Sequence, residues 1–312
     1  MKVPIVTANC RIGVCSIQKP GADHNEDSYF AEHDKTTGIV RVGVFDGIGG
    51  AENGELASQE SRDSAARILP QISPDFSNNT VSGFMTDAVM DAHAKVEERN
   101  KQTKTNSGST SNCLVILPDG RTFTSNCGDS RTYKIFSNTK WFLRWLKYLG
   151  LPVDTIRMLT LDDNYDMIYR FSKFGKLVYI KEDEIDKYLA NQKAISSVAT
   201  VGDVQKLNTE QGAIWNTRNT IYNSIGMKGY LPTVCITEAV SVPGDMYVVC
   251  TDGLVDDLTT EQILRYSTRY TDPKDTAKIL ANEAVNVMLA GKSANIRSKE
   301  IGDDVTVVVV KL

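Results

Sequence analysis

Short apolar runs, many of them alternating or β-branched, recur along this chain and predict strands. The runs cover residues 12–17, 25–31, 39–45, 111–117, 122–126, 131–136, 234–242, 246–251 and 304–311. Amphipathic stretches at 53–69, 78–102, 260–266 and 273–289 predict helices between them. Because helices come in long blocks and do not alternate with single strands, we expect class α+β. The predicted fold is a four-layer α-β-β-α sandwich of two mainly antiparallel sheets flanked by helices.

Turn residues and burial patterns add detail to this plan. Pro118-Asp119-Gly120 separates two predicted strands and is typical of a hairpin, and Pro70 should end the first helix. The last strand, 304–311, is valine at five of its eight positions and has no polar face. We therefore expect it to be buried on both sides.

The middle of the chain, about 138–220, has poor periodicity and mixes tryptophans with charged helical stretches. We interpret it as a long flap or insertion within a single domain that spans 1–312. Its aromatic and basic segment at 140–149 suits an amphipathic helix packed on its own domain. A partner-binding or membrane-surface helix is the alternative interpretation.

Composition excludes several classes of protein. The 312 residues carry a formal net charge of −4, which gives no electrostatic footprint for nucleic acid. No apolar run approaches the roughly 20 residues that span a bilayer, and the N-terminus lacks the apolar core of a signal peptide. We expect a cytoplasmic monomer that does not enter a membrane.

The cysteines and histidines do not form a metal-binding pattern. Cys10, Cys15, Cys113, Cys127, Cys235 and Cys250 include no C-x-x-C pair, and the chain has only three histidines. Zinc sites need clustered cysteine and histidine. We interpret the cysteines as small thiols, mostly buried, in a reducing compartment.

Carboxylates stand at strand ends or glycine turns in five separate segments. They are Asn25-Glu26-Asp27-Ser28, Asp46-Gly47-Ile48-Gly49-Gly50, Gly128-Asp129-Ser130-Arg131, Thr251-Asp252-Gly253 and Gly302-Asp303-Asp304-Val305-Thr306. Singly, each acid suits a helix cap or a surface charge. Brought together, they would repel one another unless a cation lay between them, and Mg²⁺ or Mn²⁺ prefers such oxygen ligands. The pattern favours metal-assisted hydrolysis.

These segments resemble the metal-dependent serine/threonine protein phosphatases of the protein phosphatase 2C (PPM) family, and the bacterial type most. The matching stretches are Asn25–Ser28, VFDGIGG at 44–50, SGST at 107–110, NCGDSR at 126–131, TDGLVD at 251–256 and GDDVTVV at 302–308. The resemblance implies a phosphatase that hydrolyses phosphoserine and phosphothreonine on proteins with water activated by two Mn²⁺ or Mg²⁺ ions.

The resemblance also implies a role for each matching residue. Asp46 would bridge the two metals, with Glu26 and the Gly47 carbonyl on one and Asp252 and Asp303 on the other. Asp129 would help to hold a third, weaker metal, together with Asp252 and Asp256. Asp27 would not bind a metal directly but would hold metal-bound water. The catalytic set is then Asp46, Asp252 and Asp303, and no protein nucleophile is needed.

Two positions depart from the family pattern. Ala22 stands where the family usually carries an arginine that grips the substrate phosphate, and Lys19 or Arg11 could replace that charge. Ile48 follows the aspartate-glycine pair, where many eukaryotic members have histidine. His24 lies close in sequence, and we interpret it as a solvated loop histidine.

Three functions stay open from the sequence. An active phosphatase agrees with the full set of carboxylates. A pseudophosphatase that binds phosphoproteins or acts as a scaffold is suggested by Ala22 and the long flap. A hydrolase acting on another phosphorylated ligand, such as a small molecule, is the third.

Overall fold

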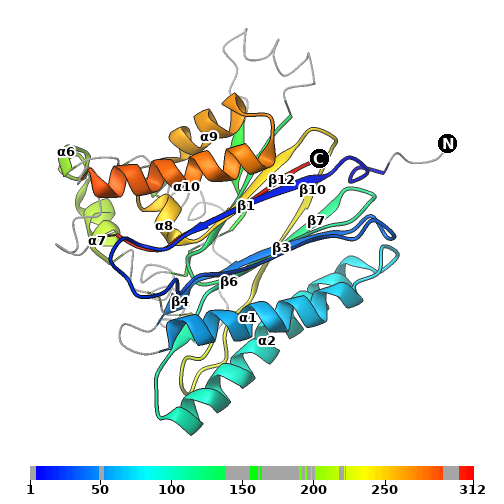
Figure 1. Cartoon of the computed structure of the whole chain (residues 1–312), viewed down its shortest axis with the longest axis horizontal. Helices are drawn as coiled ribbons and strands as arrows, with labels where there is room; N and C mark the ends of the chain where they lie inside the picture. Colours follow the sequence, from blue (N-terminus) through cyan, green and yellow to red (C-terminus); the bar gives the residue numbers. More distant parts are fainter. Residues whose placement is uncertain are drawn as a thin grey trace.

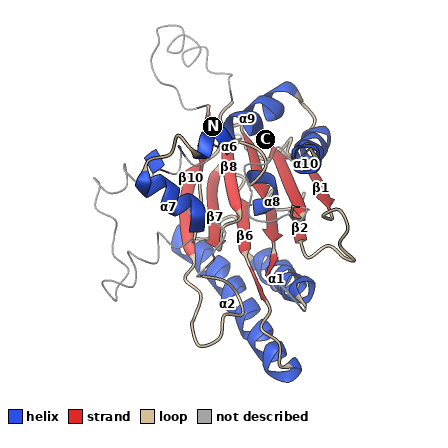
Figure 2. Cartoon of the chain, turned by 90° about the vertical axis from the view of Figure 1, so that its left-hand side faces the viewer, coloured by secondary structure: helices blue, strands red, loops and turns tan. Residues whose placement is uncertain are grey.

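The structure of the chain is a computed structural model. Two five-stranded sheets, stacked face to face, form its centre (Figure 1). The structure describes residues 5–48, 53–137, 155–160, 162–163, 190–191, 194, 198, 201–217, 221, 223–290 and 302–312. Helices cover the outer face of each sheet, so the order of layers is helix, sheet, sheet, helix (Figure 2). The predicted α+β sandwich is confirmed.

The first sheet has the order β1-β12-β11-β8-β9, and each neighbouring pair is antiparallel. Its strands are β1 (Arg11–Ile17), β12 (Val305–Lys311), β11 (Met246–Cys250), β8 (Arg131–Ile135) and β9 (Ile156–Met158). The last strand of the chain therefore lies inside this sheet, between β1 and β11.

The second sheet has the order β10-β7-β6-β3-β2 and is also antiparallel throughout. Its strands are β10 (Cys235–Val240), β7 (Arg121–Cys127), β6 (Ser111–Ile116), β3 (Val40–Phe45) and β2 (Ser28–His33). A two-stranded ribbon of β4 (Gly47–Ile48) and β5 (Gly108–Ser109) extends from one end of it. The β6–β7 pair is joined through Pro118-Asp119-Gly120, as the hairpin signal predicted.

Each sheet has its own set of helices. The second sheet is covered by α1 (Gly54–Ile68), the short 3₁₀ helix η1 (Leu69–Gln71) and α2 (Asn78–Thr103). The first is covered by α8 (Asp252–Val255), α9 (Thr260–Arg269) and α10 (Pro273–Leu289). Two further helices, α6 (Val201–Val204) and α7 (Thr209–Thr217), belong to the middle of the chain.

The valines of β12 show how the layers share one strand. Val305, Val307 and Val309 face the cluster under α8–α10, whereas Val308 and Val310 face the cluster between the sheets. All five are fully buried. Successive side chains of a strand point to opposite faces, so a strand with apolar layers on both sides needs valine at nearly every position.

Helix boundaries follow local signals in the sequence. Thr259 forms a capping box with Gln262 at the start of α9, and Asp272 caps α10 with Pro273 as its first residue. The α10 boundaries agree with prediction, but α9 runs three residues beyond the predicted Tyr266. Pro70 does end the regular helix, and the chain turns there through η1.

Little of the predicted insertion can be compared with the structure. Within 138–220 the description includes β9, α6 and α7, and the aromatic segment at 140–149 lies outside the described residues. The interpretation of that segment, like that of a single domain over 1–312, stays a prediction.

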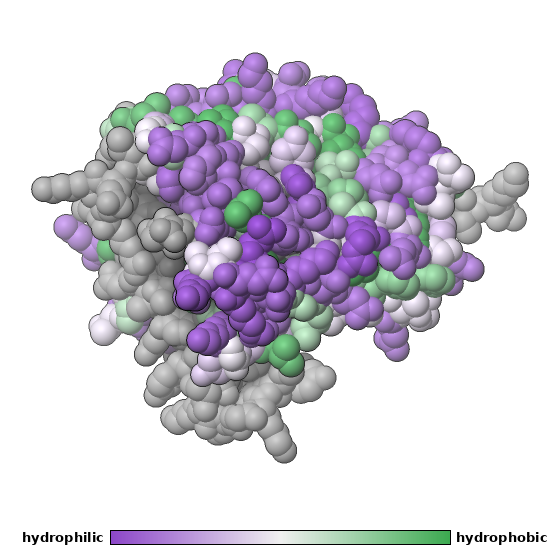
Figure 3. Space-filling view, turned by 60° about the horizontal axis from the view of Figure 1, so that its bottom comes forward, coloured by the Kyte–Doolittle hydropathy of each residue, from purple (hydrophilic) through white to green (hydrophobic). Residues whose placement is uncertain are grey.

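The face toward which α1 and α2 lie is mostly hydrophilic, with scattered apolar residues (Figure 3). These helices bury apolar side chains against the second sheet and leave polar ones outside. In the described part of the chain, no helix combines the length and the apolar character needed to cross a bilayer.

Candidate metal centre

The acidic segments meet because of the strand register. Ser28 at the start of β2 pairs with Phe45 at the end of β3, so Glu26 and Asp27 lie beside Asp46. In the first sheet, Cys250 at the end of β11 pairs with Val307 near the start of β12, which brings Asp252 to Asp303. The turn from β7 to β8 adds Asp129 at the same end of the sandwich.

Asp46 and Asp252 lie at the middle of this cluster. Burial, and then the charges of Asp27 and Asp303, raise the pKa of Asp46 well above its ordinary value, while a hydrogen bond with Asp252 acts in the opposite direction. The pKa of Asp252 is raised by burial and then by Asp46 and Asp129. Such mutual repulsion needs a proton or a cation to relieve it.

Three carboxylates of the cluster have an oxygen without a partner. Asp27 Oδ1, Asp129 Oδ1 and Asp252 Oδ1 are buried and accept no hydrogen bond from any described residue. Buried polar atoms normally form hydrogen bonds. Carboxylate oxygens without such bonds are the ligands that Mg²⁺ and Mn²⁺ prefer. The residues present therefore fit divalent cations.

Asp27 and Asp129 are further buried acids of this cluster with shifted pKa values. Asp27 Oδ2 accepts a hydrogen bond from Thr251 Oγ1 at 2.9 Å, and burial raises the pKa of Asp27 to about 8. Burial, and then Asp162 and Asp256, raise the pKa of Asp129. The charge of Asp256 thus raises the pKa of Asp129 and also that of Asp252, which lies one helical turn before Asp256.

Small residues let the backbone of β3 and β4 approach the cluster. A Cβ atom on Gly47 would lie 2.4 Å from the Gly54 carbonyl oxygen and 2.7 Å from that of Glu26. Only glycine fits between these two backbone segments. Thr110 fixes the adjacent residue, because its hydroxyl accepts from the Asp46 amide at 2.9 Å and its own amide donates to the Asp46 carbonyl at 2.9 Å. Gly49 and Gly50 lie outside the described residues.

Asp304 is a residue whose role sequence reasoning missed. It is 2% exposed, and its carboxylate accepts from the backbone amides of Lys19 and Glu26, both at 2.7 Å. It therefore fixes the loop before β2 to the start of β12. The pair Asp303-Asp304 at the start of a buried strand indicated that both acids need partners, but not which residues these are.

The structure distinguishes between the two candidate replacements for the phosphate-gripping arginine. Lys19 Nζ lies 3.9 Å from Glu26 Oε2 and 4.0 Å from Asp303 Oδ1. Arg11 lies at the other end of β1 and pairs with Asp272. Burial acts to lower the pKa of Lys19, but Asp303, Asp304 and Glu26 outweigh it and raise that pKa. Lys19 thus remains a cation beside the carboxylates.

His24 is not simply solvated. Its side chain is 57% exposed, yet Nε2 lies 3.3 Å from Glu55 Oε2 in the first turn of α1. Atoms of His24, Glu26 and Glu55 lie within 4.8 Å of one another, a spacing that could hold a metal ion. No sequence signal separates Glu55 from an ordinary acid at a helix start.

Two acids from the poorly periodic region hold the β7–β8 turn. Asp162 receives the Arg131 guanidinium, with Nε–Oδ1 at 3.0 Å. Asp163 Oδ2 accepts from the Gly128 amide at 2.9 Å and from Asn223 Nδ2 at 2.5 Å. This region therefore contributes to the position of Asp129, which its weak periodicity did not indicate.

The cysteines give no nucleophile. All six are free, and four of them, Cys10, Cys113, Cys127 and Cys250, are buried. Burial raises the pKa of the Cys10, Cys113 and Cys250 thiols to about 12. Thiols with such pKa values stay protonated and unreactive at neutral pH.

Comparison with known proteins agrees with this description. Residues 20–140 match the family model Protein phosphatase 2C, which confirms the resemblance seen in the sequence. No curated protein matches the chain in sequence.

Solved structures share the fold over almost the whole chain. The Mycobacterium tuberculosis serine/threonine phosphatase PstP/Ppp is 20% identical, with 97% of this chain and 98% of that chain covered and a TM-score of 0.64. The S. agalactiae serine/threonine phosphatase is 18% identical, with 97% of this chain and 99% of that chain covered and a TM-score of 0.65. The catalytic domain of PstP, solved in complex with two manganese ions, is 19% identical, with 97% of each chain covered and a TM-score of 0.61. These structures share the fold of this chain, and the family match covers the segments that contain Glu26, Asp46 and Asp129.

Proposed function

We propose that this chain is a metal-dependent phosphatase acting on phosphoserine and phosphothreonine of proteins. It matches the protein phosphatase 2C family model over residues 20–140 and has the fold of bacterial serine/threonine phosphatases. The observation that carries the proposal is the set of buried, unpartnered carboxylate oxygens on Asp27, Asp129 and Asp252. A purely structural cluster would be satisfied by hydrogen bonds or ion pairs.

We assign the ligands as the family resemblance implies them. Asp46 would be shared by two Mn²⁺ or Mg²⁺ ions, with Glu26 and the Gly47 carbonyl on one side and Asp252 and Asp303 on the other. Asp129, with Asp252 and Asp256, would hold a third, weaker ion. Bound divalent cations supply the positive charge that activates water and stabilises charge on a phosphoryl group in transfer.

The chain's own residues keep this centre in place. Asp304 holds the Glu26 loop against β12. Thr110 holds the backbone of Asp46 through two hydrogen bonds, one to the Asp46 amide and one to the Asp46 carbonyl. Thr251 links Asp27 to β12, because its hydroxyl donates to Asp27 and accepts from the Thr306 amide at 3.0 Å. Such fixed geometry is what a site for charge stabilisation requires.

The proposal is tested by hydrolysis of p-nitrophenyl phosphate and a phosphothreonine peptide, each with and without Mn²⁺. We expect turnover that requires the metal, and faster turnover of the phosphopeptide. A folded protein inactive on both, yet able to bind the phosphopeptide, would favour the pseudophosphatase. Turnover of small phosphoesters alone would favour the small-molecule hydrolase. The phosphoprotein substrate, the monomeric state and the cytoplasmic location stay predictions.

Lys19 is expected to strengthen phosphate binding. Replacing it with methionine keeps most of the side-chain volume and removes the charge that faces Glu26 and Asp303. We expect KM for the phosphopeptide to rise roughly tenfold, the value of one lost charge-assisted contact. The Mn²⁺ concentration for half-maximal activity should fall, because the carboxylates lose a competing cation.

Arg11→Met is the matched control, since Arg11 lies at the far end of β1. It should leave both constants unchanged. An unchanged KM in Lys19→Met would show that Lys19 does not face the substrate.

A further inference from the structure

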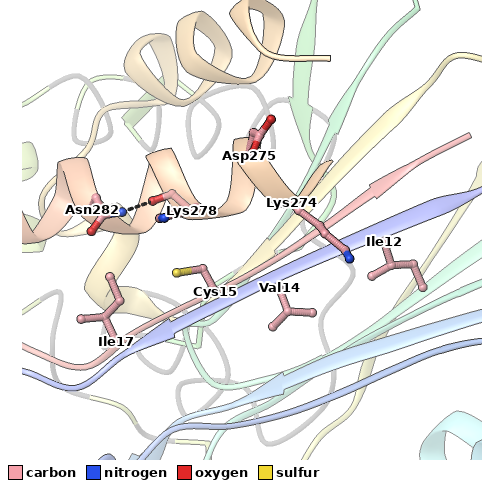
Figure 4. Close-up of a pocket in the computed structure, with 8 residues that line it drawn as sticks. All are labelled: Ile12, Val14, Cys15, Ile17, Lys274, Asp275, Lys278 and Asn282. Atoms are coloured by element: carbon pink, nitrogen blue, oxygen red, sulfur yellow. Dashed lines mark hydrogen bonds between the residues drawn. The ribbon is translucent and has the colours of Figure 1, made fainter. Parts of the chain in front are cut away.

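A groove runs along the outer side of β1 beside the first half of α10, away from any role assigned above. Its volume is about 610 Å³. Figure 4 shows Cys15 and Ile17 directed toward α10, and Ile12 and Val14 directed to the opposite side of the strand. Both faces of β1 therefore open onto the groove.

β1 is an edge strand over its whole length. All seven residues pair with β12 on one side, and no described strand pairs with the other side. Only Gly13 of the seven is buried. The edge strand of the second sheet, β2, lies at the same side of the sandwich, because β12 contacts both β3 and β2. An unpaired edge of this length is a template for another strand.

The position of α10 is fixed close to this edge. A Cβ on Gly13 would lie 2.1 Å from the Pro273 carbonyl oxygen, so the start of α10 rests directly on the β1 backbone. Lys274 and Lys278 follow on the helix, are exposed and line the groove. Lys274 extends from α10 toward β1 in Figure 4, whereas Asp275 points away from the strand.

Both lysines lack an acidic partner among the described residues. The nearest capping acid, Asp272, is paired with Arg11 at 3.2 Å. Lys278 lies close enough to Cys15 for its charge to act on that thiol, against the burial that raises the thiol pKa. Two unpaired cations therefore border a free strand edge.

The spacing of Lys274 and Lys278 along α10 matches the spacing of alternate residues in a strand added beside β1. Residues four apart on a helix are about 6 Å apart along its axis, and alternate residues of a strand are about 7 Å apart. Two acids at alternate positions of an incoming strand could each meet one lysine. The residues between them would point to the other face, beside Ile12 and Val14.

We propose that β1 binds an extended segment of a partner protein in which acidic and apolar residues alternate, added as a further strand of the first sheet. The acidic residues face Lys274 and Lys278, and the apolar ones extend the layer between the sheets. A second copy of this chain is disfavoured as the occupant, because pairing β1 with β1 would bring two sets of lysines together.

The test uses a fluorescein-labelled octapeptide of alternating glutamate and valine, with the metal-free full chain. We expect saturable binding by fluorescence anisotropy, and slower amide hydrogen exchange in residues 11–17 when the peptide is bound. The double variant Lys274→Glu/Lys278→Glu should weaken binding roughly tenfold or more, since two attractive pairs become repulsive. Both lysines are exposed, so the variant should keep its fold, which circular dichroism would verify.

Lys101→Glu, on the surface of α2, is the matched control and should bind the peptide as the wild type does. Equal affinity for a lysine–valine octapeptide, no slowing of exchange in 11–17, or an unaffected double variant would each overturn the proposal. So would sedimentation as a dimer with residues 11–17 already protected, which would give this edge to a second copy.

Discussion

Asp46→Asn should abolish metal-dependent turnover and at the same time make the metal-free protein more stable. Asp46 is held by Thr110 and shares a hydrogen bond with Asp252, so the amide can take its place without a change of shape. Loss of the proposed shared metal ligand should remove several kcal/mol of charge stabilisation, so turnover should fall by about a thousandfold or more. Steady-state hydrolysis of the phosphothreonine peptide with Mn²⁺ measures this loss.

The stability readout separates a metal site from a structural acid. At neutral pH a buried Asp46 must either bind a proton or be repelled by its neighbours, and asparagine avoids both costs. The melting temperature in EDTA should therefore rise by about 2 °C or more. Added Mn²⁺, which should stabilise the wild type strongly, should stabilise the variant little.

An exposed acid provides the control for this substitution. Asp63→Asn, on the outside of α1, removes the same charge far from the cluster and should change neither activity nor the response to Mn²⁺. Near-normal turnover in Asp46→Asn would refute the two-metal assignment. A variant that melts earlier in EDTA would make Asp46 a structural acid.

The metal-free protein should lose stability as pH rises from about 4 to about 8. Burial raises the pKa of Asp27 from 3.8 to about 8, and the pKa values of Asp46, Asp129 and Asp252 move in the same direction. The unfolded chain releases these protons near pH 4, whereas the folded chain keeps them. The stabilisation is therefore complete below pH 4 and is lost as pH rises through the folded pKa values.

Thermal unfolding in EDTA at pH 5, 6.5 and 8 measures this slope, which should amount to several kcal/mol across the range. Excess Mn²⁺ should remove most of it, because bound cations replace the protons. The pH of these measurements should stay above about 4.5 because of Asp91. Burial acts to raise the pKa of Asp91, but its hydrogen bonds outweigh burial and lower that pKa to about 2, so its stabilising contribution is lost on acidification. A metal-free stability that rises with pH would contradict the predicted cluster.

The sequence was sufficient to predict the helices and strands whose boundaries depend on local chemistry. α10 begins at a proline after a capping aspartate, and β12 is a run of valines, so both were predicted with little error. The meeting of the acidic segments was also predictable, because each segment stands at a strand end and antiparallel strands return to the same end. The alternation of helix blocks and hairpins indicated the layers.

What the sequence could not indicate depends on contacts between distant residues. Asp304 accepts from Lys19 and Glu26 across 285 and 278 positions, and no local pattern marks such a partner. The choice of Lys19 over Arg11 depends on which end of β1 faces the cluster. Asp162 and Asp163 act on the β7–β8 turn from a region without clear periodicity.

The place of β12 has a consequence for the order in which the fold forms. β12 lies between β1 and β11, and Asp303 and Asp304 directly precede it. The first sheet cannot close, and the Glu26 loop cannot be fixed by Asp304, until residues 11–17 have paired with residues 305–311. Pairing between segments so distant in sequence gives the fold a high contact order, which slows folding. The acidic cluster should therefore assemble late in folding, after the hairpins whose strands are close in sequence.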